Sequence, residues 1–163
     1  MASGNTLCVF TALHNSPPAS NPATFDTRNG TPVLDFDTTT QEIAIFVGVL
    51  PRHYAGGGVT VYLHWAATSA TSGTIGWDVA FERHLAGTDT LAADSFASAQ
   101  TVTAATVPGT AGILSVTNVA FTNGAQMDSL AVGESFRLRV RRDVSNDTAA
   151  GDGELLAAEI KES

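Results

Sequence analysis

The chain has 163 residues, a mass of 16.8 kDa and a formal net charge of −8, from 16 acidic and eight basic side chains. This length suits one domain with a sizeable core. The negative charge opposes a phosphate backbone and argues against a nucleic-acid partner. No apolar run approaches the roughly 20 residues of a membrane-spanning helix, which argues against a membrane partner.

The composition favours strands over helices. Only 15% of the residues are charged, and Lys, Glu and Leu are scarce, which is unusual for a helical bundle. Thr, Val and Gly are abundant, and they suit strands and turns. The N-terminal residues lack the basic and apolar regions of a secretory signal peptide, so we expect none.

The first strand is predicted at Thr6–Ala12, and a breaker-rich segment follows it at Leu13–Gly30. Three prolines in that segment remove backbone donors and fix φ. We therefore interpret residues 1–31 as an N-terminal strand with a proline-rich arm, and residues 32–163 as a β-sandwich domain. Such an arm could extend onto a neighbouring subunit.

Two strands are expected next, at Thr31–Phe36 and Glu42–Leu50. The second strand has isoleucines and valines on one face and Ala44, Phe46 and Leu50 on the other. Because both faces are apolar, we expect this strand to lie centrally in a sheet, covered on both sides.

The next two segments, Val59–Ala66 and Thr74–His84, alternate between apolar and polar residues and are joined by the small residues of Thr68–Gly73. This pattern predicts a β-hairpin. Trp65 and Trp77 alternate in step with aliphatic residues, so we place both in the core.

The remaining strands are predicted at Gln100–Val107, Ile113–Thr122, Ser135–Arg142 and Glu154–Lys161, with a short helical turn at Ala125–Leu130. No segment has a sustained 3.6-residue apolar period, so no helix is long enough for a parallel crossover. The sequence therefore predicts an all-β fold of eight or nine strands, an antiparallel β-sandwich of the jelly-roll type.

Half of the basic residues lie within six positions of one strand. These residues are Arg137, Arg139, Arg141 and Arg142. Three of them share the outward face, where they could pair across strands with Asp78, Glu82 or Glu159. They could equally form a contact between subunits, because guanidinium groups suit interface carboxylates. Both interpretations stay open, and this arginine group is the candidate interface.

Two tyrosines, Tyr54 and Tyr62, are candidate ligand contacts, because an aromatic ring with a polar tip could line a sugar site.

The acidic loop at residues 143–154 offers oxygen ligands with a partial calcium-loop spacing. The residues at its first, third, fifth and twelfth positions are Asp143, Ser145, Asp147 and Glu154. Thr148 stands where a calcium loop needs glycine, and strands flank the loop. We interpret it as a solvated hairpin loop, leave calcium binding open, and assign no metal site.

No catalytic arrangement stands out. Asp35 and Asp37 share one strand face, with Asp26 upstream, but such a pair is more typical of a strand end. Cys8 lies in an apolar strand without a nearby His or Lys. The four histidines are far apart in the sequence: His14, His53, His64 and His84. We expect neither an enzyme nor a cofactor.

Five runs of sequence carry a family resemblance: LDFDTTTQE, IFVGVLPRHYAGGGVTVYLHWAATSATSG, IGWDVAFER, GAQMDSLAVGESFRLRVRRD and ELLAAEIKES. They extend over most of the chain from Pro32 onward and resemble a group of small proteins encoded by tailed bacteriophages and prophages. The resemblance implies a virion structural protein with a β-sandwich fold, in a capsid decoration, head fibre or tail accessory role.

We therefore expect a non-enzymatic structural protein of a tailed-phage particle, a capsid decoration (cement) protein. Its partners would be further copies of itself, with a trimer favoured, and the major capsid protein or another virion protein. The alternative is a carbohydrate- or receptor-binding module on a head or tail fibre, with a host surface glycan as its ligand. Either protein would be made in the host cytoplasm and located in the virion.

Overall fold

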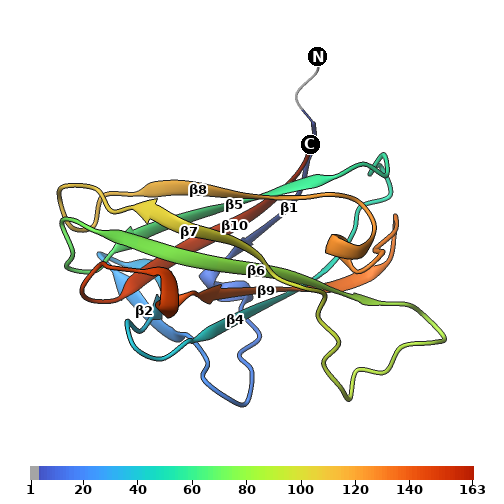
Figure 1. Cartoon of the computed structure of the whole chain (residues 1–163). Helices are drawn as coiled ribbons and strands as arrows, with labels where there is room; N and C mark the ends of the chain where they lie inside the picture. Colours follow the sequence, from blue (N-terminus) through green and yellow to red (C-terminus); the bar gives the residue numbers. More distant parts are fainter. Residues whose placement is uncertain (1–3) are drawn as a thin grey trace.

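Two antiparallel sheets pack face to face in a β-sandwich of the jelly-roll type (Figure 1). The structure is a computed structural model, and it describes residues 4–163. Within that range the chain forms ten strands, three short 3-10 turns and no helix that is long and apolar enough to cross a membrane. The predicted all-β sandwich is confirmed.

The larger sheet has six strands, in the order β2-β3-β10-β5-β8, with β1 also paired to β10. Its strands are β1 (Thr6–Thr11), β2 (Thr24–Arg28), β3 (Thr31–Phe36), β5 (Val59–Ala67), β8 (Ser115–Phe121) and β10 (Gly153–Glu162). The long strand β10 pairs with three others, because β3 and β1 lie one after the other along the same edge.

The smaller sheet has four strands in the order β4-β9-β6-β7. Its strands are β4 (Ile43–Val49), β6 (Thr74–His84), β7 (Gln100–Thr106) and β9 (Ser135–Arg142). The 3-10 turns are η1 (Ala12–His14), η2 (Ala125–Met127) and η3 (Val144–Asn146). The second of these turns falls within the predicted helical turn.

The core lies between the two sheets and is rich in aromatic rings. Trp65 and Trp77 are both fully buried, with ring centroids 6.0 Å apart. Phe36 meets Trp77 edge-on at 5.2 Å, and Phe81 meets Phe121 in the same way at 4.9 Å. These arrangements suit aromatic quadrupoles. The prediction that both tryptophans are core residues is confirmed.

The predicted hairpin between residues 59 and 84 is wrong. β5 pairs with β10 and β8 in one sheet, whereas β6 pairs with β9 and β7 in the other. The connection Thr68–Gly73 therefore crosses from one sheet to the other. Two strands that face each other across a core alternate in the same way as two that pair side by side, so the pattern alone could not distinguish them.

The N-terminal segment, predicted to be a separate strand and arm over residues 1–31, is part of the sandwich. β1 pairs with β10, and the proline-rich segment contains the unexpected strand β2, which pairs with β3. Leu7 and Ala23 join the common core. The described part of this segment therefore packs on its own sandwich, while residues 1–3 of the predicted arm lie outside the described residues.

β4, predicted to be a central strand, is an edge strand. The proline-rich segment lies along the first half of its free edge, because Ser16 donates to the carbonyl of Ile45 at 2.7 Å and Ala23 donates to that of Ile43 at 2.9 Å. In the second half, the side chains of Val47 and Val49 are more than half exposed. Irregular chain thus occupies part of the free edge of β4, and the apolar outer face that suggested a central position stays exposed at Val47 and Val49.

Residues 85–98, here called the strap, cover the outer face of β6. Ala97 donates to the carbonyl of Phe81 at 2.9 Å, and Ser95 donates to the carboxylate of Glu82. Asp78 and Glu82 project from this outward face as the alternation predicts, yet they are 9% and 0% exposed. The strap and Arg137 contact Glu82, whereas Arg141 and Thr101 of β7 contact Asp78.

Candidate functional site

Arg137 and Arg141 are paired with acidic side chains of their own subunit. Arg137 forms ion pairs with Glu82 and, at 2.6 Å, with Asp94 of the strap. Arg141 pairs with Asp78 at 3.1 Å. Glu82 and Asp78 lie opposite these arginines in the register of β6 and β9. The cross-strand interpretation therefore accounts for both guanidinium groups.

Arg139 contacts the strap through an aromatic ring. Its guanidinium carbon lies 4.6 Å from the ring centroid of Phe96, and that of Arg137 lies 5.0 Å from the same centroid. These distances suit cation–π attraction. Burial, together with the neighbouring charge of Arg141, lowers the pKa of Arg139. The outward arginines thus hold the strap against the sheet.

Arg142 was predicted to belong to the candidate interface, and this prediction is wrong because its side chain is buried inside the sandwich. Its side chain is 0% exposed, and its Nε donates to Oδ2 of Asp147 at 2.6 Å. It also donates to the backbone carbonyls of Phe36, Ala149 and Gly151. Strand alternation puts this arginine on the core face, where these acceptors satisfy the buried charge.

Tyr54, the other candidate ligand contact, is almost fully buried. It is only 6% exposed, its hydroxyl donates to the carbonyl of Gly57, and it lies among core residues. Burial raises the pKa of its phenol. Tyr54 supports the loop before β5 and lines a hollow of about 300 Å³ together with Asn123 and Leu130, so a ligand contact there stays a prediction.

Tyr62 lies on the outer face of the six-stranded sheet, partly exposed. In the sheet register it stands between Glu159 of β10 and Asn118 of β8. His64 follows on the same face of β5. We call Glu159, Tyr62 and Asn118 the polar row. Glu159 was suggested as a partner of the arginine group, but it lies in the opposite sheet, so that pairing is wrong.

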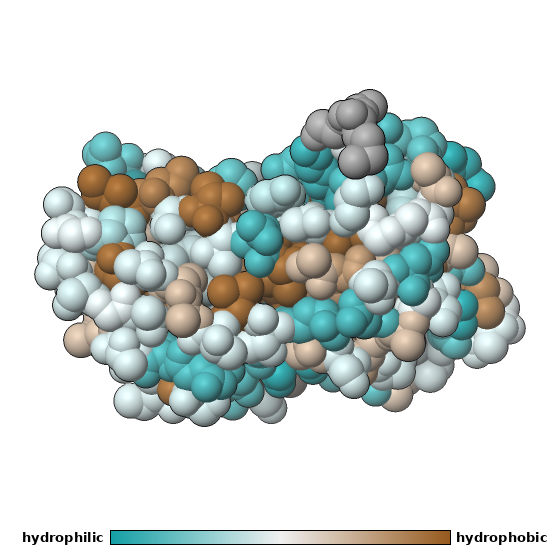
Figure 2. Space-filling view, turned by 45° about the horizontal axis from the view of Figure 1, so that its top comes forward, coloured by the Kyte–Doolittle hydropathy of each residue, from teal (hydrophilic) through white to brown (hydrophobic). Residues whose placement is uncertain are grey.

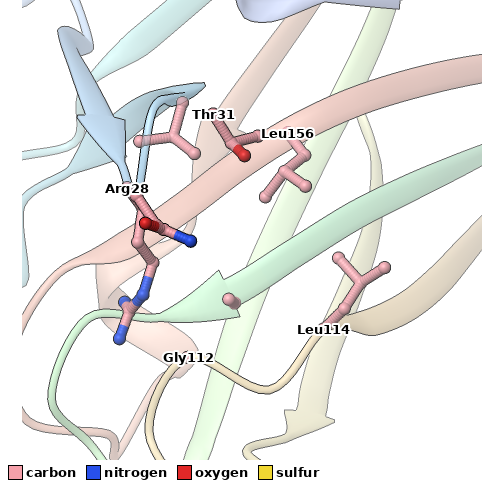
Figure 3. A pocket seen from close by; sticks show the side chains of 8 residues that line it. Arg28, Thr31, Gly112, Leu114 and Leu156 are labelled. Atoms are coloured by element: carbon pink, nitrogen blue, oxygen red, sulfur yellow. The ribbon is translucent and has the colours of Figure 1, made fainter.

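A shallow trough continues this face toward the end of β5. Two adjoining hollows of about 270 and 310 Å³ share Thr31 and Leu156. Figure 3 shows Leu114 and Leu156 directed into the first hollow, with Arg28 at its side. Arg28 pairs with Glu154 at 2.7 Å, which leaves little net positive charge there. The trough is therefore mainly apolar.

Carboxylates gather near the Arg28 end of the trough. Asp35 lies opposite Glu154 in the register, and its buried Oδ1 has no hydrogen-bond partner. Burial raises the pKa of Asp35 to about 6, helped by the negative charges of Glu154, Asp26, Asp152 and Glu42. An anionic ligand would be repelled here.

Asp37 has the strand-end role that the sequence predicts. Its carboxylate accepts hydrogen bonds from the hydroxyl and backbone N–H of Thr39 and from the N–H of Thr40. These bonds lower its pKa to about 2. Asp37 thus closes a turn and does not act with Asp35 as an acid–base pair.

The acidic loop is not a hairpin, because it joins β9 in one sheet to β10 in the other. Its carboxylates are engaged separately: Asp143 accepts from Ser145 and Asn146, Asp147 pairs with Arg142, and Glu154 pairs with Arg28. Among residues 4–163, no group of three or more His, Cys, Asp or Glu side chains is placed to hold a metal ion.

The structure does not bring the histidines and Cys8 together. His14 Nδ1 accepts from the N–H of Thr11, His84 lies 3.5 Å from the carboxylate of Glu82, and His64 lies near Tyr62. Burial raises the pKa of Cys8, which opposes thiolate formation. These residues form no nucleophile–base arrangement.

The fold is similar to that of two carbohydrate-binding modules. A family 35 module from an environmental isolate matches with a TM-score of 0.54 and 12% identity, over 94% of this chain and 92% of that module. The C-terminal CBM6 of LamC, a marine laminarinase from Zobellia galactanivorans, matches with a TM-score of 0.52 and 12% identity, over 97% and 100% of the two chains. No family model and no curated protein sequence matches. These likenesses show the fold.

Proposed function

We propose that this protein is a non-catalytic carbohydrate-binding module whose ligand lies along the outer face of the six-stranded sheet. The observation that carries the proposal is the polar row, in which a partly exposed tyrosine stands between a carboxylate and an amide. The row leads into an open trough. The similar fold of two modules of that name supports the choice of ligand class.

The chemistry of the row suits a sugar. A tyrosine ring can pack on the C–H face of a pyranose while its hydroxyl stays in water. The carboxylate of Glu159 accepts hydrogen bonds from sugar hydroxyls, and the amide of Asn118 both donates and accepts them. Because carboxylates surround the Arg28 end of the trough, we expect a neutral oligosaccharide to bind better than an acidic one.

A glycan array followed by titration calorimetry tests this proposal. The wild-type protein should bind a neutral oligosaccharide, and Tyr62→Ala should weaken that binding at least about tenfold, or ~1.4 kcal/mol. Phe25→Ala is the matched control, because Phe25 is 53% exposed on β2, outside the row. Equal loss in both variants, or no binding to any glycan, would overturn the proposal.

The sequence resemblance adds a location to this proposal. A module of a tailed-phage particle would be displayed on a head or tail fibre, with a host surface glycan as its ligand. Immunogold labelling of purified particles tests this location, and an absence of label would reject it without affecting the glycan-binding result.

A further inference from the structure

One continuous stretch of the chain carries no charged side chain. Residues 95–127 contain no Asp, Glu, Lys, Arg or His, although the whole chain has a net charge of −8. This stretch includes β7 and β8, which are edge strands of the two sheets and lie beside each other (Figure 1). Natural proteins usually protect exposed edges with charges or prolines, and these two strands contain neither.

The backbone of β8 has open hydrogen-bonding groups along its outer edge. The backbone N–H of Gly112 donates to the carbonyl of Ala67. The backbone N–H and C=O groups of the odd-numbered residues of β5 therefore point toward β8. Their β8 partners are the odd-numbered residues from Ser115 to Phe121. By alternation, the N–H and C=O groups of Val116, Asn118 and Ala120 point away from the sheet. None of these three residues has a backbone partner on that side within the described chain.

Apolar side chains flank this edge at one end. Ile113, Leu114 and Val116 are 51%, 49% and 51% exposed. Figure 2 shows apolar surface gathered at the end of the molecule where β8 begins. An open edge next to exposed aliphatic groups is typical of a surface that another chain covers.

We propose that a second copy of this chain covers the edge, with the two β8 strands antiparallel about a two-fold axis at Asn118. Asn118 then pairs with Asn118 of the second copy, and Val116 pairs with Ala120, each pair exchanging its two N–H···O bonds. The outer faces of the two six-stranded sheets lie on the same side of the dimer, because residues directly opposite each other in a strand pair share a face. The six-stranded sheet thereby continues into its copy.

The distribution of charge favours a second copy of the chain at this edge. Two copies that each carry −8 repel one another over most of their surfaces. The side with β7 and β8 is where like copies can approach without bringing acidic groups together. The arginine group is a weaker candidate, because its two paired arginines are engaged inside their own subunit. The inference does not rest on glycan binding, although Asn118 also belongs to the polar row, and it gives a dimer in place of the trimer expected from the sequence.

Sedimentation equilibrium without glycan tests the proposal. The wild-type chain should change from its monomer mass of 16.8 kDa to twice that mass as concentration rises. Asn118→Pro removes an outward N–H and leaves the bonds to β5 intact, so the variant should remain monomeric at least about tenfold higher in concentration. Val47→Pro, in the exposed half of the β4 edge, is the matched control and should still dimerise.

A second variant keeps the test decisive if Asn118→Pro does not fold. Asn118→Lys places two ammonium groups at the two-fold axis, which should also prevent dimers, and raised salt should partly restore them. A monomer at every concentration, a trimer, or dimers unchanged in the folded Asn118 variants would overturn the proposal.

Discussion

Arg142 Nε lies 2.6 Å from Oδ2 of Asp147, with the two side chains 0% and 6% exposed. The ion pair closes the inner end of the loop between β9 and β10. Because three backbone carbonyls complete the guanidinium's hydrogen bonds, the arginine is stable in the core only as long as every acceptor is present.

Asp147→Ala should therefore be among the most damaging single changes in this chain. It leaves a buried guanidinium without its counter-ion, and we expect a loss of about 3–5 kcal/mol in the free energy of unfolding. Urea denaturation followed by tryptophan fluorescence measures the loss. The control is Asp94→Ala, which removes a partner that is 72% exposed and should cost under about 1 kcal/mol. Similar losses in the two variants would contradict the prediction.

The strap should loosen when its aromatic anchor is removed. Phe96→Ala eliminates the contacts with Arg137 and Arg139 and should cost about 1 kcal/mol. Hydrogen exchange at Ser95 and Ala97 should become faster, while exchange in the core strands stays unchanged. Leu91→Ala is the control, because Leu91 lies in the strap but is 78% exposed. Unchanged exchange in Phe96→Ala would show that the ring does not anchor the strap.

Asp35→Asn should stabilise the protein in a pH-dependent way. The folded-state pKa of about 6 exceeds the ordinary 3.8, so ionising Asp35 costs the folded state more than the unfolded chain. That penalty is absent below 3.8, grows up to about 6 and is complete above it. The variant should gain thermal stability near neutral pH, and the gain should vanish in acid. A constant gain at all pH values would reject this origin.

Asp37→Ala should show the opposite dependence. The folded-state pKa of about 2 is below the ordinary 3.8, so the ionised carboxylate stabilises the folded state above 3.8. This contribution is lost as the pH falls toward 2. Melting temperatures should therefore be lower than wild type near neutral pH and approach it in acid. A difference that persists at the acid end would point to a loss unrelated to charge.

Thr117→Val should leave the indole of Trp65 without an acceptor. Trp65 Nε1 donates to Thr117 Oγ1 at 3.0 Å, and the ring is fully buried. We expect a loss of about 1–3 kcal/mol by chemical denaturation. Thr60→Val changes a hydroxyl on the outer face of β5 and should cost less than about 0.5 kcal/mol. If both variants lost equal stability, β-propensity and not the indole bond would explain it.

The strands could be predicted from the sequence because alternation sets which face of a strand is buried. Nine of the ten strands described in residues 4–163 fall at predicted places. Alternation does not show which strands are neighbours, and for this reason the pattern wrongly predicts a hairpin of β5 and β6. The alternation pattern also did not predict β2, because the prolines beside that strand indicate a loop and its residues are largely exposed.

The candidate site was predictable only in part. The face that Tyr62 occupies follows from the pattern of β5, but the partners Glu159 and Asn118 come from strands far away in the sequence. Tyr54 could not be judged, because it lies in a loop where no periodicity applies. The trough depends on which strands lie beside β5, and local sequence carries no signal for that.

β10 pairs with β1, β3 and β5, and it is the last strand. Thr6 has no partner until the chain has been made as far as Lys161. Because most contacts in this sheet join distant parts of the sequence, folding should be slow for a chain of this size. Until β10 has been made, the edges of β1, β3 and β5 lack their shared partner, so the nascent chain is vulnerable to misassembly through these open edges.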